Sequence, residues 1–215
     1  MAVKVVFFDV GETLVDEARL WRGWAAWLGV PADAFTAALG ETIAAGEPHR
    51  QVFERFRPGF DIGAARRERA AAGDPDLFTE GDLYPDAAPC LAALRERGFT
   101  VGIAGNQAAG AEAALEALGL PADLVTSSAR LGAEKPAPAF FAGLAAMAGV
   151  APEKIAYVGD RLDTDVLPAR AAGMIAAFLA RGPWGRAHAL RPEAQLARLR
   201  LASLAELPDA IAGLR

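Results

Sequence analysis

Short apolar runs alternate along the chain with longer segments in which apolar residues recur at helical spacing. The runs are continuous and are bounded by turn-forming residues, which is typical of strands buried on both faces of a parallel sheet. The pattern therefore predicts five buried parallel strands. They are Val3–Phe8, Thr100–Ala104, Leu124–Thr126, Ile155–Val158 and Ile175–Leu179.

The segments between these runs predict helices that each end just before a glycine, the usual left-handed stop of a helix. Strands that alternate with helices in this way indicate an α/β fold, a doubly wound domain around a five-strand parallel sheet. The predicted helices are Asp86–Arg97, Ala111–Leu118, Ala137–Ala148 and Thr164–Ala172.

Residues 17–85 interrupt the alternation, because they contain helical segments separated by Gly and Pro but no strand-like run. We expect a helical domain here, inserted into a core domain formed by residues 1–16 and 86–215. Three tryptophans spaced three residues apart share one face of the first helix of the insertion, which favours a role in its own core or in a subunit contact. They are Trp21, Trp24 and Trp27.

Composition narrows the class of protein. The 215 residues are 53% hydrophobic and 23% charged, as in an ordinary globular protein, and the net charge of −5 disfavours binding to nucleic acid or an anionic membrane through bulk charge. The single cysteine, Cys90, excludes an internal disulfide, and the N-terminus has no long apolar segment. We expect a cytoplasmic monomer or homodimer with a small soluble partner.

Polar residues with chemical potential follow four of the predicted strands. In an open parallel sheet, ligands bind beyond the carboxyl ends of the strands, so these residues are expected to meet at one edge. Asp9 follows the first strand, Gly105 and Asn106 the second, Lys135 the third, and Asp160 the fourth, with Asp163 and Asp165 close behind.

These residue types suit phosphate chemistry. Asp9 and Asp160, from separate strands, could hold Mg²⁺, and Lys135 could add a second positive charge toward a phosphate. Asp9 could then attack phosphorus and form an aspartyl phosphate. Backbone N–H groups around Gly11, Glu12 and Gly105 could bind the phosphoryl oxygens.

Each of these residues also has a purely structural interpretation. Asp9 could end a strand in a turn, while Asp160 and Asp165 could cap the helix that follows them. Lys135, which precedes a proline, could be a solvated turn residue, and Asn106 could bond its own backbone in a turn.

Four segments in order resemble the motifs of the haloacid dehalogenase superfamily. FFDVGETL resembles the first motif, usually written DxDGT, AGNQ the second, EKPAPAFF the third and VGDRLDTD the fourth. The resemblance spans nearly the whole chain. It implies that the helical insertion is the cap of the first subclass, which closes over the active site, and that RGPWG forms a loop at its rim.

The resemblance also implies roles for individual residues. Asp9 would be the nucleophile and a metal ligand, the Gly11 carbonyl and Asp160 would be further ligands of Mg²⁺, and Asp165 would assist through the waters of the metal. Lys135 would hold Asp9 and the phosphate in register, and Asn106 would bind phosphate. The implied activity is hydrolysis of a small phosphorylated metabolite.

The chain departs from the motifs at two positions. Gly11 replaces the second Asp, the general acid and base of the phosphatases, and Gly105 replaces a Ser or Thr. Glu12 could substitute for the missing acid. Two alternatives to the phosphatase stay open: a catalytically weakened relative that binds magnesium and phosphate, and a dehalogenase of 2-haloacids, which needs no metal and also lacks the second Asp.

Overall fold

The chain folds into two compact units in the computed structural model, which describes residues 2–107 and 111–214. The first, called here the α/β unit, contains residues 1–16 and 79–215, and the second, called the helical unit, contains residues 17–78. The insertion predicted at 17–85 is therefore longer than the helical unit. Residues 79–85, with the short 3₁₀ helix η1 (Glu80–Asp82), group with the α/β unit.

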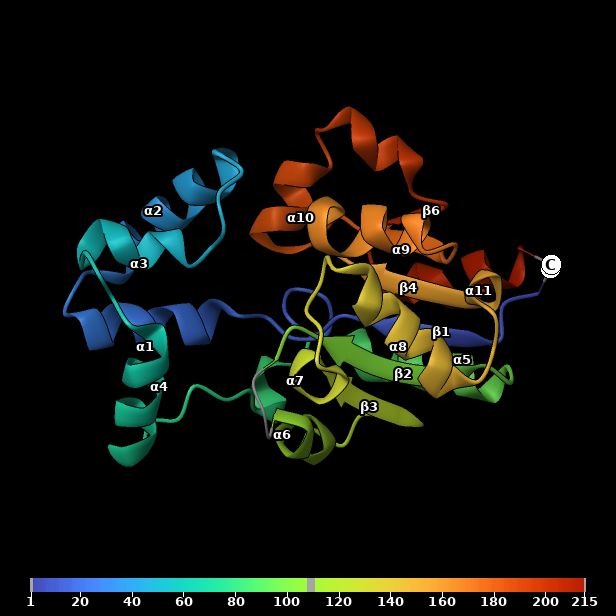
Figure 1. The fold of residues 1–215 in the computed structure, drawn as a ribbon, viewed down its shortest axis with the longest axis horizontal. Helices are drawn as coiled ribbons and strands as arrows, with labels where there is room; N and C mark the ends of the chain where they lie inside the picture. Colours follow the sequence, from blue (N-terminus) through green and yellow to red (C-terminus); the bar gives the residue numbers. More distant parts are fainter. Residues whose placement is uncertain (1, 108–110, 215) are drawn as a thin grey trace. The chain divides into compact units, whose positions relative to one another are not determined.

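A six-stranded, entirely parallel sheet forms the centre of the α/β unit, with strand order β3-β2-β1-β4-β5-β6 (Figure 1). The predicted α/β fold is confirmed, and each of the five predicted strands is present. The strands are β1 (Val5–Phe8), β2 (Thr100–Gly105), β3 (Leu124–Ser127), β4 (Ile155–Gly159), β5 (Ile175–Leu179) and β6 (Leu199–Leu201).

The sixth strand corrects the predicted count of five. β6 is a three-residue strand at the edge of the sheet and pairs only with β5. Its central residue, Arg200, is exposed, so the sequence here is Leu-Arg-Leu rather than a continuous apolar run. A short edge strand buries too few side chains to produce the pattern by which the other five were predicted.

The strand order reverses at β1, which lies between β2 and β4. Phe8 at the end of β1 is level with Val158 in β4, so the residues that follow these two strands leave the sheet side by side. Such a reversal opens a crevice at the carboxyl ends of the strands, where ligands of doubly wound folds bind.

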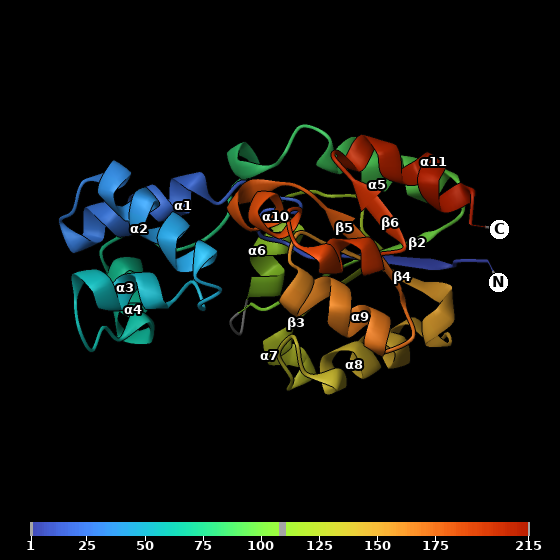
Figure 2. The same ribbon diagram turned by 90° about the horizontal axis from the view of Figure 1, so that it is seen from above.

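Helices cover both faces of the sheet. In Figure 2, α5 and α11 lie on one side and α7, α8 and α9 on the other. A π-helical segment, η3 (Leu162–Val166), leads directly into α9, so the predicted helix Thr164–Ala172 begins within a π turn. The helices are α5 (Ala87–Glu96), α6 (Ala111–Ala117), α7 (Ser128–Leu131), α8 (Pro138–Ala148), α9 (Leu167–Ala171), α10 (Gly182–His188) and α11 (Leu207–Ala212).

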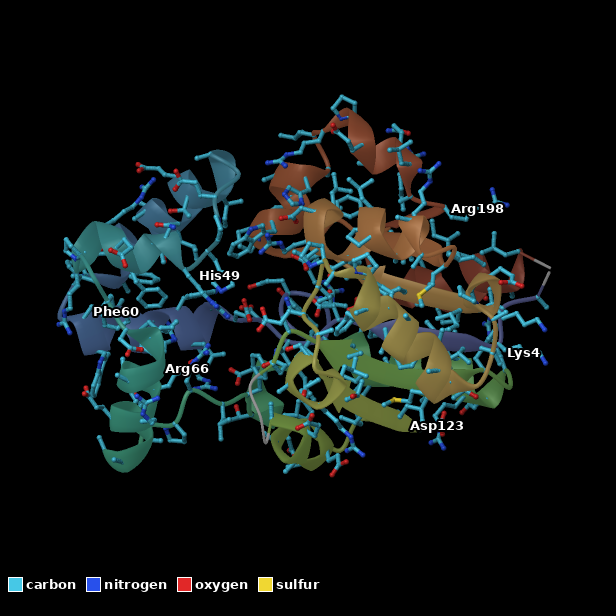
Figure 3. The ribbon with its side chains drawn as sticks, viewed as in Figure 1. Lys4, His49, Phe60, Arg66, Asp123 and Arg198 are labelled. Carbon is cyan, nitrogen blue, oxygen red and sulfur yellow. The ribbon has the colours of Figure 1, made fainter. Side chains whose placement is uncertain are left out.

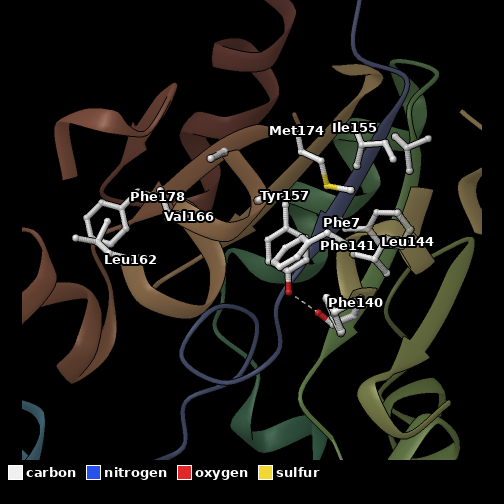
Figure 4. Close-up of a cluster of buried hydrophobic side chains, with 14 of the residues drawn as sticks. Phe7, Phe140, Phe141, Leu144, Ile155, Tyr157, Leu162, Val166, Met174 and Phe178 are labelled. Atoms are coloured by element: carbon white, nitrogen blue, oxygen red, sulfur yellow. Dashed lines mark hydrogen bonds between the residues drawn. The ribbon is translucent and has the colours of Figure 1, made fainter. Parts of the chain in front are cut away.

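Aromatic rings fill the core between the sheet and α8 (Figure 4). Phe7, Phe140, Phe141 and Tyr157 are all fully buried, and the ring centroids of Phe141 and Tyr157 lie 5.4 Å apart in an edge-to-face arrangement. The Tyr157 hydroxyl donates a hydrogen bond of 2.7 Å to the Ala104 carbonyl, which satisfies its polar group inside the core.

The helical unit contains four α-helices, and all of its residues are described. Trp24 is buried there, with its ring 5.1 Å from that of Phe53 and the Arg69 guanidinium 4.4 Å from its centroid. Phe60 also packs on Trp24, and Figure 3 shows its side chain within this unit. The tryptophan face thus contributes to the core of the unit. The helices are α1 (Ala18–Leu28), α2 (Ala32–Ala44), α3 (Gln51–Phe56) and α4 (Ile62–Ala71).

Membrane insertion through a helix finds no support in the fold. Within residues 2–107 and 111–214, no helix has the length and apolar character that a transmembrane span requires.

Replacing Gly102 by Ala should destabilise the α/β unit. Gly102 pairs with Phe7 across β1 and β2, and an added Cβ would lie 2.3 Å from the Phe7 ring. Overpacking of this kind costs about 1–3 kcal/mol. Chemical denaturation should show the loss, whereas Gly40→Ala, at an exposed site in α2 where a Cβ meets nothing within 4 Å, should not destabilise the protein. Equal unfolding midpoints for Gly102→Ala and wild type would contradict this packing.

Candidate active site

A tight turn directly after β1 presents Asp9 at the crevice. The Asp9 N–H donates to the Val158 carbonyl (2.9 Å), which fixes the start of the turn against β4. The carbonyl of the next residue, Val10, then accepts three N–H groups, so the chain folds back on itself within one turn. The donors are Thr13 (3.3 Å), Leu14 (2.9 Å) and Val15 (3.1 Å).

A buried lysine bridges two carboxylates at this point. Lys135 Nζ lies 2.6 Å from Asp9 Oδ1 and 2.6 Å from Asp165 Oδ1, and Lys135 is only 6% exposed. Burial opposes its charge, but the carboxylates of Asp165 and Asp9 outweigh burial and hold the pKa of Lys135 well above its ordinary value. The lysine is thus a fixed cation in contact with the predicted nucleophile.

Asn106 positions the backbone of Lys135. Its side-chain amide donates from Nδ2 to the Lys135 carbonyl (2.9 Å) and accepts at Oδ1 from the Lys135 N–H (2.8 Å). Both ends of the amide are therefore engaged by the segment that carries the lysine. The predicted phosphate contact of Asn106 stays a prediction, and its observed bonds give it a supporting role.

Two further carboxylates complete an acidic cluster. Asp9, Asp160 and Asp165 each have an oxygen within 4.8 Å of the others, and Asp160 and Asp165 are buried. Burial raises the pKa of Asp160 well above its ordinary value, and the negative charges of Asp165 and Asp9 add to the effect. Burial also raises the pKa of Asp165, to about 6, although Lys135 opposes it.

The donor set of this cluster fits a divalent cation. Asp160 Oδ2 is buried and has no hydrogen-bond partner among the described residues, which is costly for a carboxylate oxygen unless a cation compensates it. Three carboxylates beside a single lysine leave a local excess of negative charge. Hard oxygen donors of this kind are the ligands that Mg²⁺ prefers.

The start of η3 holds Asp165 in place. Asp165 Oδ2 accepts a hydrogen bond from the Arg161 N–H (3.0 Å), so the loop between β4 and α9 wraps around this carboxylate. A Cβ at Gly159 would lie 2.4 Å from the same oxygen, so only glycine leaves room for Asp165 here. Packing against Asp165 therefore explains why Gly159 is a glycine.

Gly105 has a similar steric role beside Asp9. A Cβ at this position would lie 2.8 Å from Asp9 Oδ1 and 3.2 Å from the Val10 side chain. The missing side chain therefore provides the space that the Asp9 carboxylate occupies. Its predicted contribution to phosphate binding stays a prediction.

Glu12 forms hydrogen bonds with Val15 and Tyr84. Its N–H donates to the Val15 carbonyl (2.7 Å), and its Oε2 accepts a hydrogen bond of 2.6 Å from the Tyr84 hydroxyl. Its charge also contributes to the raised pKa of Asp160, after burial and the other carboxylates of the cluster. Gly11 forms an isolated parallel bridge with Val15 in the same turn. The phosphate role of Glu12 and the metal role of the Gly11 carbonyl stay predictions.

Several residues around this site were not among the site residues predicted from the sequence. The Tyr157 ring lies 5.5 Å from Lys135 Nζ, and Tyr84 and Arg181 contact the turn after β1. Each is far from Asp9 in the chain and lies outside the four motifs. Arg181 begins the RGPWG segment that was expected at the rim of the site, and this segment starts helix α10 instead of forming a loop. Backbone pairing brings Tyr84 to the turn: its N–H donates to the Leu14 carbonyl (3.0 Å), and Leu83 forms a bridge with Val15.

Comparisons with known proteins identify the family of this chain. A family model described as haloacid dehalogenase-like hydrolase matches residues 3–173. The chain is 40% identical over 202 residues to a protein of Methanopyrus kandleri named glyceraldehyde 3-phosphate phosphatase, a match that covers 85% of this chain and 86% of that one.

Solved structures share the fold at lower identity. A putative HAD-hydrolase from Bacillus subtilis bound to magnesium superposes with a TM-score of 0.73 at 18% identity, covering 98% of this chain and 99% of that one. An L-2-haloacid dehalogenase from Xanthobacter autotrophicus with chloropropionic acid covalently bound has a TM-score of 0.72 at 21% identity, covering 99% and 100%. The family model and the Methanopyrus relative together show that this chain belongs to the haloacid dehalogenase-like hydrolases and is an enzyme of that family.

Proposed function

We propose that this enzyme is a magnesium-dependent phosphatase that hydrolyses a small phosphorylated metabolite through an aspartyl phosphate on Asp9. One observation carries the proposal: a carboxylate paired with a buried lysine stands beside two buried carboxylates, one of which has an unpartnered oxygen. This arrangement lies at the carboxyl ends of β1 and β4, where the strand order reverses.

The proposed ligands of the ion are Asp9, the Gly11 carbonyl and Asp160, with Asp165 placed behind them. When bound, Mg²⁺ would neutralise charge on the phosphate. Lys135 holds Asp9 Oδ1 in a fixed position and offers its positive charge to the phosphoryl oxygens.

Asp9 is the nucleophile in this proposal. One of its carboxylate oxygens bonds to phosphorus while the ester bond to the leaving group breaks, and the departing oxygen takes up a proton. Water then attacks phosphorus, which releases inorganic phosphate and restores the Asp9 carboxylate. Because Gly11 stands where the motif has an acid, proton transfer to the leaving group is the step at which this site differs most from the motif.

The Methanopyrus relative supports a substrate class, because its name gives a three-carbon phosphate ester as the substrate of that protein. We propose a similarly small polar phosphate ester for this chain. The helical unit, inserted between β1 and α5, is proposed as the cap that selects it.

The dehalogenase and the weakened relative are separated from this proposal by one set of assays. Turnover of an aryl phosphate that requires magnesium and stops with a chelator supports the phosphatase. Binding of magnesium and phosphate without turnover supports the weakened relative. Halide release from 2-haloacids without metal supports the dehalogenase, although three clustered carboxylates with an unpartnered oxygen favour a site for a cation.

Replacing Asp9 by Asn should lower kcat for an aryl phosphate by about a thousandfold or more, because the amide is not a competent nucleophile. Folding should persist, since the change is isosteric. The matched control is Asp209→Asn, an exposed carboxylate on α11 that pairs with Arg97, and it should keep wild-type activity. An Asp9→Asn variant that retains most of its turnover would refute the proposed mechanism.

Replacing Asp160 by Asn should stabilise the protein in chelator by about 1–3 kcal/mol, because the amide removes a buried and uncompensated charge. The pKa of Asp160 is raised above 3.8 on folding, so the wild type loses stability as pH rises above that value, and the variant should lose less.

Calorimetric unfolding with and without MgCl₂ checks this prediction. Magnesium should raise the unfolding temperature of the wild type, because it binds the folded state, and should have little effect on the variant. Equal stabilisation of both proteins by magnesium would contradict a role for Asp160 in binding the ion.

A further inference from the structure

Glu12 has an unusual backbone conformation. Among the described residues it is the one non-glycine residue with positive φ, at 53°. An L-residue held in the left-handed region costs on the order of 1 kcal/mol or more, and such residues persist where surrounding contacts fix them. The motif that this turn resembles has glycine here, so the chain has placed a side chain where the backbone favours none.

Two residues distant in the chain hold the Glu12 side chain. The Tyr84 hydroxyl donates to Glu12 Oε2 at 2.6 Å, a short bond of the kind made to a charged acceptor. Burial, together with the bond to Glu12, raises the pKa of Tyr84, so the phenol stays protonated as a donor. Gly182 lies close to the same carboxylate, because a Cβ at this position would be 2.4 Å from Glu12 Oε2. Glu12, Tyr84 and Gly182 form what we call the Glu12 clasp.

Arg181 fixes the tyrosine of the clasp. Its guanidinium carbon lies 4.1 Å from the centroid of the Tyr84 ring, and its Nη1 donates to the Thr13 carbonyl at 3.0 Å. Arg181 also forms an ion pair with Asp86 Oδ2, which accepts hydrogen bonds from the Ser203 hydroxyl (2.7 Å) and the Leu204 N–H (3.0 Å). Arg181 is thus fixed by Thr13 and Asp86, and it in turn holds the ring of Tyr84.

The clasp acts on the peptide group between Gly11 and Glu12. The orientation of this peptide, and so of the Gly11 carbonyl, is coupled to the φ angle of Glu12. If the side chain of Glu12 were released, φ could relax toward the more favourable negative region. The carbonyl would then turn away from its present direction.

We infer that Tyr84 is a positioning residue which acts through Glu12 to hold the turn after β1 in the conformation that binds the cation. The inference rests on the magnesium site of the proposed function and goes beyond it, since the described side-chain contacts of Tyr84 are with Glu12 and Arg181 rather than with the proposed ligands of the cation. Gly182 has the complementary role of leaving space for the held carboxylate.

The test is a double-mutant cycle with magnesium binding as its readout, measured by isothermal titration calorimetry without substrate. The proteins are wild type, Tyr84→Phe, Glu12→Gly and the double variant. Tyr84→Phe should weaken magnesium binding about tenfold, as removal of an outer partner of a metal site typically does. Glycine adopts positive φ freely, so in the Glu12→Gly background the same change should alter binding by less than about twofold.

Gly182→Ala provides a second, independent variant. Its methyl group would collide with the Glu12 carboxylate, so it should weaken magnesium binding in the wild-type background. Gly182 has a φ of 64°, so alanine also strains the backbone in both backgrounds. The part of the effect that acts through Glu12 is therefore the amount by which the loss is smaller beside Glu12→Gly than in the wild type. Unfolding temperatures in chelator verify that each variant is folded before its affinity is compared.

Three results would overturn the inference. Wild-type affinity in Tyr84→Phe would show that the hydroxyl does not position the site. An equal loss in both backgrounds would show that Tyr84 does not act through Glu12. If the wild type itself binds no magnesium, the proposed function fails together with the inference, and that result is recognisable because it precedes any comparison of variants.

Discussion

The site depends on how a buried lysine and three clustered carboxylates balance their charges. Lys135 pairs directly with Asp9 and Asp165, while a buried oxygen of Asp160 has no hydrogen-bond partner in the part of the chain that the structure describes. Buried charges are tolerated only when they are compensated, so one ammonium group is too little for this cluster. The neighbouring features serve the same arrangement: Asn106 fixes the backbone of Lys135, and the glycines at 105 and 159 allow the carboxylates to approach.

The fold and the acidic residues were predictable because both depend on strong local patterns. Buried parallel strands produce continuous apolar runs, and the carboxyl ends of such strands meet at one edge, so Asp9 and Asp160 could be placed together from the sequence. β6 escaped prediction because a short edge strand with an exposed Arg200 buries too little to leave a pattern. The limit is physical, since periodicity reports burial rather than hydrogen bonding.

The supporting residues were not predictable, because their roles depend on tertiary contacts. Tyr84 and Arg181 reach the turn after β1 from distant parts of the chain, and although Arg181 begins the RGPWG segment expected near the site, its contact with the turn was not predicted. Gly105 was noticed in the sequence, but its role was not. Compared with the motif it is a lost Ser or Thr, whereas in the fold its missing Cβ makes room for Asp9. A motif records residue types and spacing, but not the volume that each residue leaves for its neighbours.

The turn after β1 shows how a local departure is compensated at a distance. Where the motif has an acid followed by glycine, this chain has glycine followed by an acid, so the residue with positive φ carries the carboxylate. A local rule broken in this way requires support from the rest of the structure. Tyr84, between η1 and α5, and Gly182, at the start of α10, supply this support. Substitutions at Gly11 and Glu12 are therefore coupled to these distant positions, and a change that restores the motif at Glu12 alone would leave Tyr84 without its acceptor.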